Sequence, residues 1–401
     1  MTRPVVALLF AQFAAYHIDR CEAVAARLGD RAEVLAVEVA TTSATYGWEA
    51  SGVVAGARKR TLFPGEAYEA VPRWRRFWRQ FAALWRCRMV AIGIGYDQGD
   101  IIALSWALAL CGVRVVLLSE SKFDDAPRRI GIEALKALAL LPYRAAVVGA
   151  SRHMAYMRFL GFCRRKVLPG YDTVGLARVL AQGGGVAAPE GTPHGARPFL
   201  FVGRFVEKKN LAALLDGYAA YRALSAAPHR LVMVGAGPAE AGLRAQIAEL
   251  GLDGHVDLPG FLGAGDVARL LAESLALVLV SQVEQWGLVV NEALAFRLPV
   301  IVSGAVGARD ALVRNLVNGF VVEDAAGLAL AMGALSEEAG WRRMVAAAGD
   351  RAALGDVARF ADAIEMLFDG NPASAASVEC FCQAIGWDEA RFARGWSKRQ
   401  A

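Results

Sequence analysis

Short apolar runs that alternate with helical stretches constrain the fold of this chain more than any other feature. Four runs in the first half are hydrophobic on both faces of an extended strand: VVALLF (5–10), MVAIGIG (89–95), VRVVLLS (113–119) and AAVVGAS (145–151). Strands of this kind, separated by helices, are typical of a parallel sheet that is covered on both sides. The first half is therefore predicted to be a doubly wound α/β domain of the Rossmann type.

A second series of the same kind fills the other half. Its strand-like runs are FLFVGR (199–204), HRLVMVGAG (229–237), HVDLPGF (255–261), LALVLVS (275–281) and LPVIVS (298–303). A chain of 401 residues is too long for one ordinary core, so two domains are expected. The glycine- and proline-rich stretch QGGGVAAPEGTPHGARP shows no periodicity and separates the two series.

These boundaries predict an N-terminal Rossmann-like domain over residues 1–174, a linker over 175–197 and a second Rossmann-like domain over 198–370. The remaining residues, 371–401, have helical spacing and are predicted to pack toward the N-terminal domain. Open parallel sheets bind ligands beyond the carboxyl ends of their strands. Two such domains that face each other would place the site in the cleft between them.

Charge and cysteine content add weak constraints. The net charge of +5 suits an anionic ligand or membrane surface and does not demand nucleic acid, so no nucleic-acid partner is predicted. Of the six cysteines, only Cys380 and Cys382 lie close together, with no second pair and no histidine at zinc spacing. This scatter is typical of reduced thiols. We expect a cytoplasmic protein, with the inner face of the membrane as a possible location.

The segment SQVEQWGLVVNEALAFRLPVIVS (281–303) places two carboxylates, Glu284 and Glu292, in largely apolar surroundings. Buried charges are costly unless something pairs with them. The pattern predicts a buried strand, a short turn and a helix that opens at Gly287. Such an arrangement presents free backbone N–H groups to an anion, most naturally a phosphate. A nucleotide sugar would fit, with the diphosphate at the helix start and one carboxylate toward each end.

Basic residues follow the first strand of the second half, in VGRFVEKKN (202–210). Arg204 and Lys209 can direct a guanidinium and an ammonium at one diphosphate, with Lys208 as the rival of Lys209. A solvated charged loop is the structural alternative. The glycine turn around Gly235, in VGAGP, is a weak signal because many α/β folds need glycine there for geometry.

Taken together, VGRFVEKKN, LVMVGAGP, VDLPGFLGAGDVARLL and the spacing of the two glutamates resemble the donor domain of retaining GT-B glycosyltransferases, specifically glycosyltransferase family 4. The resemblance covers about residues 199 to 325. The segment 150–174 extends it into the first half, as the final helix, strand and hinge before the linker. It implies a GT-B fold: two Rossmann-like doubly wound domains facing a central cleft, with a C-terminal helix crossing back to the N-terminal domain. In such a fold residues 1–174 would form the acceptor domain and residues 198–370 the nucleotide-sugar donor domain.

The resemblance also implies roles for individual residues. Arg204 and Lys209 would stabilise the donor diphosphate, Glu284 would hold sugar hydroxyls and Glu292 the ribose. The backbone of Gly287, Leu288 and Val289 would wrap the phosphates, and the backbone around Leu262 would read the base. Gly235 belongs to the same donor-binding set.

Several positions depart from the family pattern. Gln285 replaces the more usual glycine and Trp286 the usual phenylalanine, while Phe296 and Arg297 stand where small residues are common. The glycine-rich loop often seen after the first strand is missing. These departures leave open which sugar is transferred.

The reaction implied by the resemblance is transfer of a hexose-type sugar, with retention, from a UDP or GDP sugar to a carbohydrate or lipid-linked acceptor in glycan or polysaccharide biosynthesis. In this family retention is usually ascribed to a front-face route that needs no enzymic nucleophile. Stabilisation of the leaving diphosphate would fall on Arg204, Lys209 and the helix end. Because no Asp-x-Asp motif occurs in the sequence, we predict no essential metal, and no cofactor other than the donor substrate.

The first half supplies weaker candidates at strand exits. His17 and Arg20 follow the first strand, and Glu120 and Lys122 follow the run that ends at residue 119. All four are candidate contacts to the acceptor or the donor sugar. A structural histidine and a charged surface loop are the alternatives that we favour.

The segment PRWRRFWRQFAALWRCR (72–88) has aromatic residues on one helical face and arginines on the other. Such a helix can lie in an anionic membrane interface. The alternative, which we favour at this stage, is a core helix whose basic side is exposed. Peripheral membrane contact through 72–88 is therefore one of two hypotheses.

Three other functions compete with transfer. A nucleotide-sugar epimerase could use the same architecture, and a catalytically silent protein could bind the nucleotide sugar. A dinucleotide oxidoreductase is disfavoured because no strand is followed by Gly-x-Gly-x-x-Gly with an acid about twenty residues later.

Overall fold

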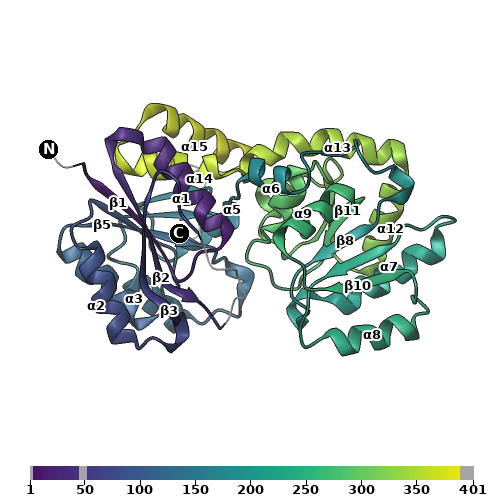
Figure 1. Cartoon of the computed structure of the whole chain (residues 1–401), viewed down its shortest axis with the longest axis horizontal. Helices are drawn as coiled ribbons and strands as arrows, with labels where there is room; N and C mark the ends of the chain where they lie inside the picture. The colour runs from purple at the N-terminus through teal and green to yellow at the C-terminus, as the bar shows by residue number, and fades with distance from the viewer. Residues whose placement is uncertain (1–2, 45–51, 389–401) are drawn as a thin grey trace, which may run out of the picture. The chain divides into compact units, whose positions relative to one another are not determined.

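The structure, a computed structural model, describes residues 3–44 and 52–388 and consists of two compact units (Figure 1). Unit 1 comprises the chain up to Thr173 and again from Val357 onward. Unit 2 comprises Val174–Asp356. Each unit is a parallel sheet with helices on its faces, which confirms the predicted doubly wound α/β class.

Unit 1 is built on a seven-stranded sheet in the order β3-β2-β1-β4-β5-β6-β7, with every pair parallel. Its strands are β1 (Val5–Phe10), β2 (Glu33–Thr42), β3 (Arg58–Ala67), β4 (Met89–Ile92), β5 (Arg114–Ser119), β6 (Ala145–Val148) and β7 (Lys166–Pro169). Its helices are α1 (Ala15–Leu28), α2 (Arg73–Leu84), α3 (Gly99–Leu110), α4 (Ile130–Ala139), α5 (Ser151–Phe159), α14 (Val357–Phe368) and α15 (Pro372–Ala384).

The core of unit 1 follows from the alternation of side chains along its strands. Val6, Leu8 and Phe10 of β1 point to one face, where they join a buried cluster with α1 and α14. The intervening residues Ala7 and Leu9 are equally buried on the opposite face. Burial on both faces explains why these runs are continuously apolar.

Unit 2 repeats this plan with a six-stranded parallel sheet in the order β10-β9-β8-β11-β12-β13. Its strands are β8 (Phe199–Val202), β9 (Leu231–Val234), β10 (Val256–Gly260), β11 (Ala276–Leu279), β12 (Val300–Ser303) and β13 (Gly319–Val322). Its helices are α6 (Leu176–Gln182), α7 (Leu211–Leu224), α8 (Glu240–Glu249), α9 (Ala264–Glu273), α10 (Val289–Ala295), α11 (Arg309–Leu312), α12 (Ala325–Ser336) and α13 (Glu338–Ala352).

Some boundaries differ from those expected from the sequence. Residues 357–370, assigned there to the second domain, form α14 and pack on α1 within unit 1. The expected linker 175–197 includes α6, which belongs to unit 2. The last part of the predicted C-terminal segment, residues 389–401, lies outside the described residues. No periodicity in the sequence could have shown which sheet α14 covers, because its apolar face would suit either.

Three strands, β2, β3 and β13, were not predicted from the sequence. β3 contains Pro64 and Gly65, which weaken a strand signal, but it lies at the edge of its sheet, where proline is tolerated. β13 is an edge strand of four residues.

The orientation of α2 contradicts the favoured interpretation of segment 72–88. Its inward face consists of Arg76, Gln80 and Leu84, whereas Trp74 and Trp78 are exposed. The aromatic face is therefore on the outside and not in the core. Among the described residues, no helix is long and apolar enough to cross a membrane.

Candidate functional site

Backbone hydrogen bonds tie together the loops that leave three neighbouring strands of unit 2. The N–H of Gly203 donates to the carbonyl of Val234 at 3.0 Å, and the N–H of Gly235 donates to the carbonyl of Gly260 at 2.9 Å. The loops after β8, β9 and β10 therefore begin side by side. Arg204 and Leu262 lie just beyond this row, at the carboxyl edge of the sheet.

Gly235 has a structural reason to be glycine. Its φ is +145°, and a Cβ at this position would lie 1.9 Å from the carbonyl oxygen of Gly203. Any other residue would push the β8 and β9 loops apart. This observation explains the glycine without requiring a ligand.

The turn that carries Lys209 is attached to the loop that carries Glu284. The N–H of Gln282 donates to the carbonyl of Lys208 at 2.8 Å, and the Asn210 amide donates to the carbonyl of Val280 at 3.3 Å. Asn210 has the left-handed backbone conformation that asparagine tolerates, and it starts α7. Asn210 was not predicted as a site residue, although an asparagine directly after a basic turn and before a helix is a local signal.

Lys209 and Glu284 form a partly buried ion pair, although 75 positions separate them in the chain. The hydroxyl of Ser281 donates to the same carboxylate oxygen at 3.0 Å. Lys208 is exposed, so of the two rival lysines only Lys209 joins the pair. The guanidinium of Arg204, five residues earlier, is exposed and has no ion pair or hydrogen bond with the described residues.

Gly287 allows the tight turn between Glu284 and α10. Its φ is +97°, and a Cβ there would come within 2.8 Å of the Leu279 side chain. Within the part of the chain that the structure describes, the N–H groups of Gly287, Leu288 and Val289 have no hydrogen-bond acceptor. The helix itself starts two residues later than expected, at Val289, and half-buried Glu292 lies in its first turn.

A buried tryptophan supports this turn from below. The indole N–H of Trp286 donates to Asn291 at 2.9 Å, and the Asn291 amide donates to the carbonyl of Gly355 at 3.0 Å. Trp286, noted as a departure from the family pattern, thus takes part in a buried hydrogen-bond chain within unit 2. Neither Ser281 nor Asn291 was predicted, because single polar residues in apolar runs give no sequence signal.

In unit 1, the histidine among the predicted contacts is part of the fold. His17 is buried, and its Nδ1 accepts the N–H of Ala14 at 3.0 Å, at the start of α1. The centroid of its ring lies 4.2 Å from the centroid of the Phe10 ring. Burial, with the neighbouring charge of Arg20 as a smaller cause, lowers the pKa of His17 well below its usual value.

Arg20 and Glu120 belong to a buried charged cluster in the same unit. The Arg20 side chain is fully buried, donates from Nε to the carbonyl of Thr173 at 3.2 Å and lies over the ring of Tyr171. Burial and the negative charge of Glu120 raise the pKa of Asp172. The cluster unites two of the predicted contacts, with Arg20 enclosed and Glu120 half-buried.

Lys122 is fully buried as well. Its ammonium lies 3.0 Å from Asp124 Oδ2 and 3.2 Å from Asp125 Oδ1. The positive charge of Lys122 is therefore balanced by two carboxylates of its own loop. Contact with an acceptor would require the loop to open.

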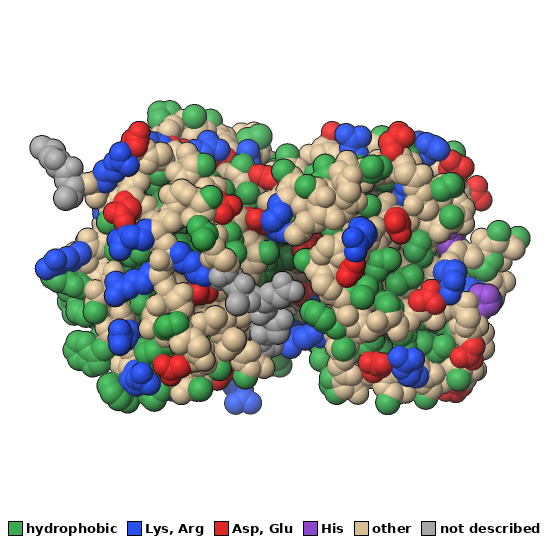
Figure 2. All heavy atoms as spheres, viewed as in Figure 1, with side chains coloured by type: hydrophobic (Ala, Val, Ile, Leu, Met, Phe, Trp, Pro, Cys, Tyr) green, Lys and Arg blue, Asp and Glu red, His purple; other side chains and the backbone are tan. Residues whose placement is uncertain are grey.

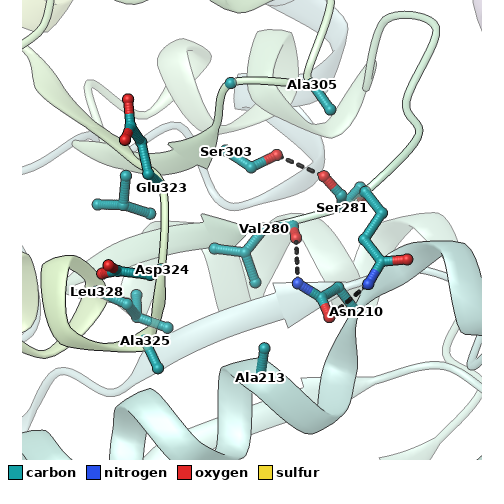
Figure 3. A pocket seen from close by; sticks show the side chains of 13 residues that line it. Asn210, Ala213, Val280, Ser281, Ser303, Ala305, Glu323, Asp324, Ala325 and Leu328 are labelled. Carbon is teal, nitrogen blue, oxygen red and sulfur yellow. Dashed lines mark hydrogen bonds between the residues drawn. The ribbon is translucent and has the colours of Figure 1, made fainter. Parts of the chain in front are cut away.

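A pocket of about 320 Å³ adjoins the candidate site of unit 2 (Figure 3). Asn210 and Ser281 line one side, where Ser303 donates to the Ser281 carbonyl, and Glu323 and Asp324 lie across from them. The charged side chains Arg204, Lys209, Glu284 and Glu292 are not among its lining residues. Ser281 connects the two places because its hydroxyl binds Glu284. Among the described residues, no three His, Cys, Asp or Glu side chains gather as a metal site.

Residues 187–349 match the sequence profile of the family described as "Glycosyl transferases group 1". The matched region covers most of unit 2, where the paired and exposed charges lie. No curated protein matches the sequence.

Solved structures resemble the chain over nearly its whole length. A sucrose-phosphate synthase from Thermosynechococcus elongatus is 20% identical, with a TM-score of 0.66, and the match covers 91% of this chain and 98% of that one. Anabaena HepE, in complex with UDP and glucose, is 14% identical, with a TM-score of 0.65 and coverage of 91% and 99%. A trehalose-6-phosphate synthase studied for glycosyl transfer with retention is 13% identical, with a TM-score of 0.64 and coverage of 90% and 98%.

The class follows from these findings. The chain has the GT-B fold, as expected, and its second unit carries the sequence pattern of group 1 glycosyl transferases. The fold and the sequence pattern together support the assignment of this protein as a glycosyltransferase.

Proposed function

We propose that this protein is a retaining glycosyltransferase that moves a hexose-type sugar from a nucleotide-diphosphate sugar to a carbohydrate or lipid-linked acceptor. The observation that carries the proposal is the Lys209–Glu284 ion pair next to the free amides of residues 287–289. Such a site offers a cation and N–H donors to a diphosphate and a carboxylate to sugar hydroxyls. HepE, which shares the fold, binds UDP and glucose, and this supports a UDP sugar as the first donor to test.

Each group has a proposed task. Arg204 and Lys209 stabilise the negative charge that grows on the leaving diphosphate, and the amides of Leu288 and Val289 donate to its oxygens. Glu284 accepts hydrogen bonds from sugar hydroxyls, and Glu292 accepts from the ribose diol. The backbone around Leu262 reads the base, while Gly235 keeps the loop that carries Arg204 in place.

The ion pair has a consequence for donor binding. In the structure, Glu284 pairs with Lys209 and balances its charge. A bound diphosphate would compete for the same ammonium and release the carboxylate toward the sugar. Binding of the two ends of the donor would thus be coupled through one lysine.

Retention is proposed through a front-face route. The bond from the anomeric carbon to the diphosphate breaks, and the acceptor oxygen bonds to the same face of that carbon. The acceptor proton passes to the leaving diphosphate, so no enzymic nucleophile is required. Two cationic side chains at the diphosphate support a metal-independent reaction, because they supply the charge that a metal would otherwise contribute.

A cytoplasmic location is proposed as well. None of the six cysteines, which all lie within the described residues, forms a disulfide, as is usual in a reducing compartment. Polysaccharide or glycoconjugate biosynthesis is the proposed setting, because a lipid-linked or carbohydrate acceptor is its common substrate.

The test begins with the donor. UDP, GDP, ADP and their sugar conjugates are screened for an increase in thermal stability, since a ligand stabilises the state that binds it. With the donor identified, Lys209→Ala and Glu284→Ala should lower turnover by about 10²- to 10³-fold.

Matched controls come from the same turn. Lys208→Ala removes an exposed positive charge and is the control for Lys209→Ala. Glu207→Ala removes an exposed negative charge and is the control for Glu284→Ala. Both variants should leave turnover within about twofold. The proposal is wrong if no nucleotide sugar raises the melting temperature, or if the Lys209 and Glu284 variants turn over as fast as these controls.

A further inference from the structure

The outward face of α2 carries a continuous aromatic stripe. Trp74, Trp78 and Trp85 are 68%, 60% and 40% exposed, and Phe81 is half-buried between them. Steps of four, three and four residues place these side chains one above another on a single face of a helix. Solvent-exposed tryptophans in such a row are costly in water and mark an interaction surface.

A buried ion pair fixes the direction of this face. Arg76 points inward, where its Nε lies 2.9 Å from Asp100 Oδ2 at the start of α3. The guanidinium also lies over the Tyr68 ring, 4.2 Å from its centroid. Gln80 and Leu84 continue the buried side of the helix. The aromatic stripe cannot turn inward without carrying Arg76 outward and leaving the buried Asp100 carboxylate unpaired in the core.

Arginines border the stripe. The segment 72–88 contains six arginines and no acidic residue. Arg76 is paired with Asp100, and Arg75 lies 3.6 Å from Glu66. The other four are exposed and have no ion pair with the described residues: Arg73, Arg79, Arg86 and Arg88.

We propose that this aromatic and basic surface docks unit 1 onto an anionic lipid bilayer. Tryptophan prefers the headgroup level of a membrane, and arginine attracts anionic lipids. Figure 2 shows hydrophobic side chains interspersed with basic ones over the part of unit 1 where Figure 1 labels α2. The charge pattern selects a lipid surface over a second copy of this chain, because two copies facing each other here would bring their arginines together.

The neighbouring helix extends the surface. α3 packs beside α2, and its Trp106 and Leu110 are 42% and 83% exposed. A helix pair that lies in the interface buries its apolar side chains by about 5–10 Å without spanning the bilayer. The described helices agree with this mode, since none is suited to span a membrane.

Vesicle flotation of the full chain tests the proposal. Phosphatidylcholine vesicles are compared with vesicles of equal parts phosphatidylcholine and phosphatidylglycerol. We expect binding to the mixed vesicles, and a loss of about tenfold or more in the variant Trp74→Ala/Trp78→Ala/Trp85→Ala. The variant Arg79→Gln/Arg86→Gln should lose roughly tenfold on the mixed vesicles and bind phosphatidylcholine as before.

Leu224→Ala/Leu330→Ala is the matched control, since both leucines are exposed on unit 2. It should bind vesicles like the unmodified chain. All three variants remove exposed side chains, so unchanged melting temperatures would show that they fold. The proposal fails if the unmodified chain does not bind the mixed vesicles, or if the tryptophan variant binds as well as the control. It also fails if light scattering shows a dimer that the tryptophan variant abolishes and no vesicle binding occurs, because the stripe then serves a second copy of the chain. Donor turnover plays no part in these measurements, so their failure would leave the proposed transferase activity untouched.

Discussion

Charged residues at the strand ends of the two units have different surroundings. In unit 2, Arg204 is exposed and Lys209 and Glu284 form a partly buried pair. In unit 1, Arg20 and Lys122 are completely enclosed, and His17 is buried at the start of α1. All of them follow strands in the same type of fold, so a position at a strand exit does not by itself make a residue available to a ligand.

The difference lies in the loops. The unit 2 residues lie on short loops whose backbones are tied to one another, as between Gln282 and Lys208, so the side chains are held at the edge of the sheet. The unit 1 residues find their partners inside the unit, as Lys122 does with Asp124 and Asp125 of its own loop and Arg20 does with the carbonyl of Thr173. Changes in unit 1 should therefore reduce stability, and changes in unit 2 should reduce activity.

The largest effect is expected at Lys122. Lys122→Met leaves the largely buried Asp125 without its ammonium partner, while the more exposed Asp124 keeps Arg152, and should lower the free energy of unfolding by about 3 kcal/mol. Arg244→Met, which removes an exposed arginine paired with Glu240 on α8, should cost less than about 1 kcal/mol. Urea unfolding measures both. Equal losses in the two variants would break the comparison, because Lys122 would then behave as a surface residue.

Arg204→Ala should show the opposite pattern. Because its guanidinium is exposed and unpaired among the described residues, its removal should leave the melting temperature unchanged. Turnover of the donor should fall about 10²-fold, since one stabilising charge at the leaving diphosphate is lost. Arg230→Ala, an exposed arginine of the same unit paired with Asp257, is the control that should retain activity. A variant at Arg204 that unfolds early and transfers normally would contradict the assignment of this residue to the site.

The smallest effect concerns His17 and pH. Burial lowers its pKa below the ordinary value of 6.5, so the unfolded chain takes up a proton on this residue before the folded chain does. Stability is therefore fully present above about pH 6.5 and is lost as pH falls below it, by at most about 1.4 kcal/mol per pH unit.

His17→Gln keeps an acceptor for the Ala14 N–H and removes the titration. Urea midpoints compared between about pH 7.5 and about pH 5.5 should therefore fall less in this variant than in the unmodified chain. If the urea midpoint falls equally in both proteins, His17 titrates in the folded chain as it does in the unfolded chain. It would then be accessible, as a ligand contact would be.

Local sequence patterns accounted for much of unit 2. Glycines at residues 235 and 287 marked turns that the backbone does require, and the basic run after β8 contained the lysine that pairs with Glu284. These signals were readable because each one lies within a few residues of chain. The choice between Lys208 and Lys209 could not be predicted from the sequence, because it depends on which side chain the turn directs at a loop 75 positions away.

The sequence by itself determined the doubly wound class, because strands that are buried on both faces appear as runs of consecutive apolar residues. It also predicted where the candidate site lies, because the glycine turns and the basic run are local patterns. The tertiary structure decided which side of α2 faces the core, which sheet α14 covers and which charges are enclosed. The physical reason is that an amphipathic helix has one polar and one apolar side. A partner distant in the chain decides which of the two sides faces the core. For α2 that partner is Asp100, whose buried carboxylate draws Arg76 inward and leaves the tryptophans outside.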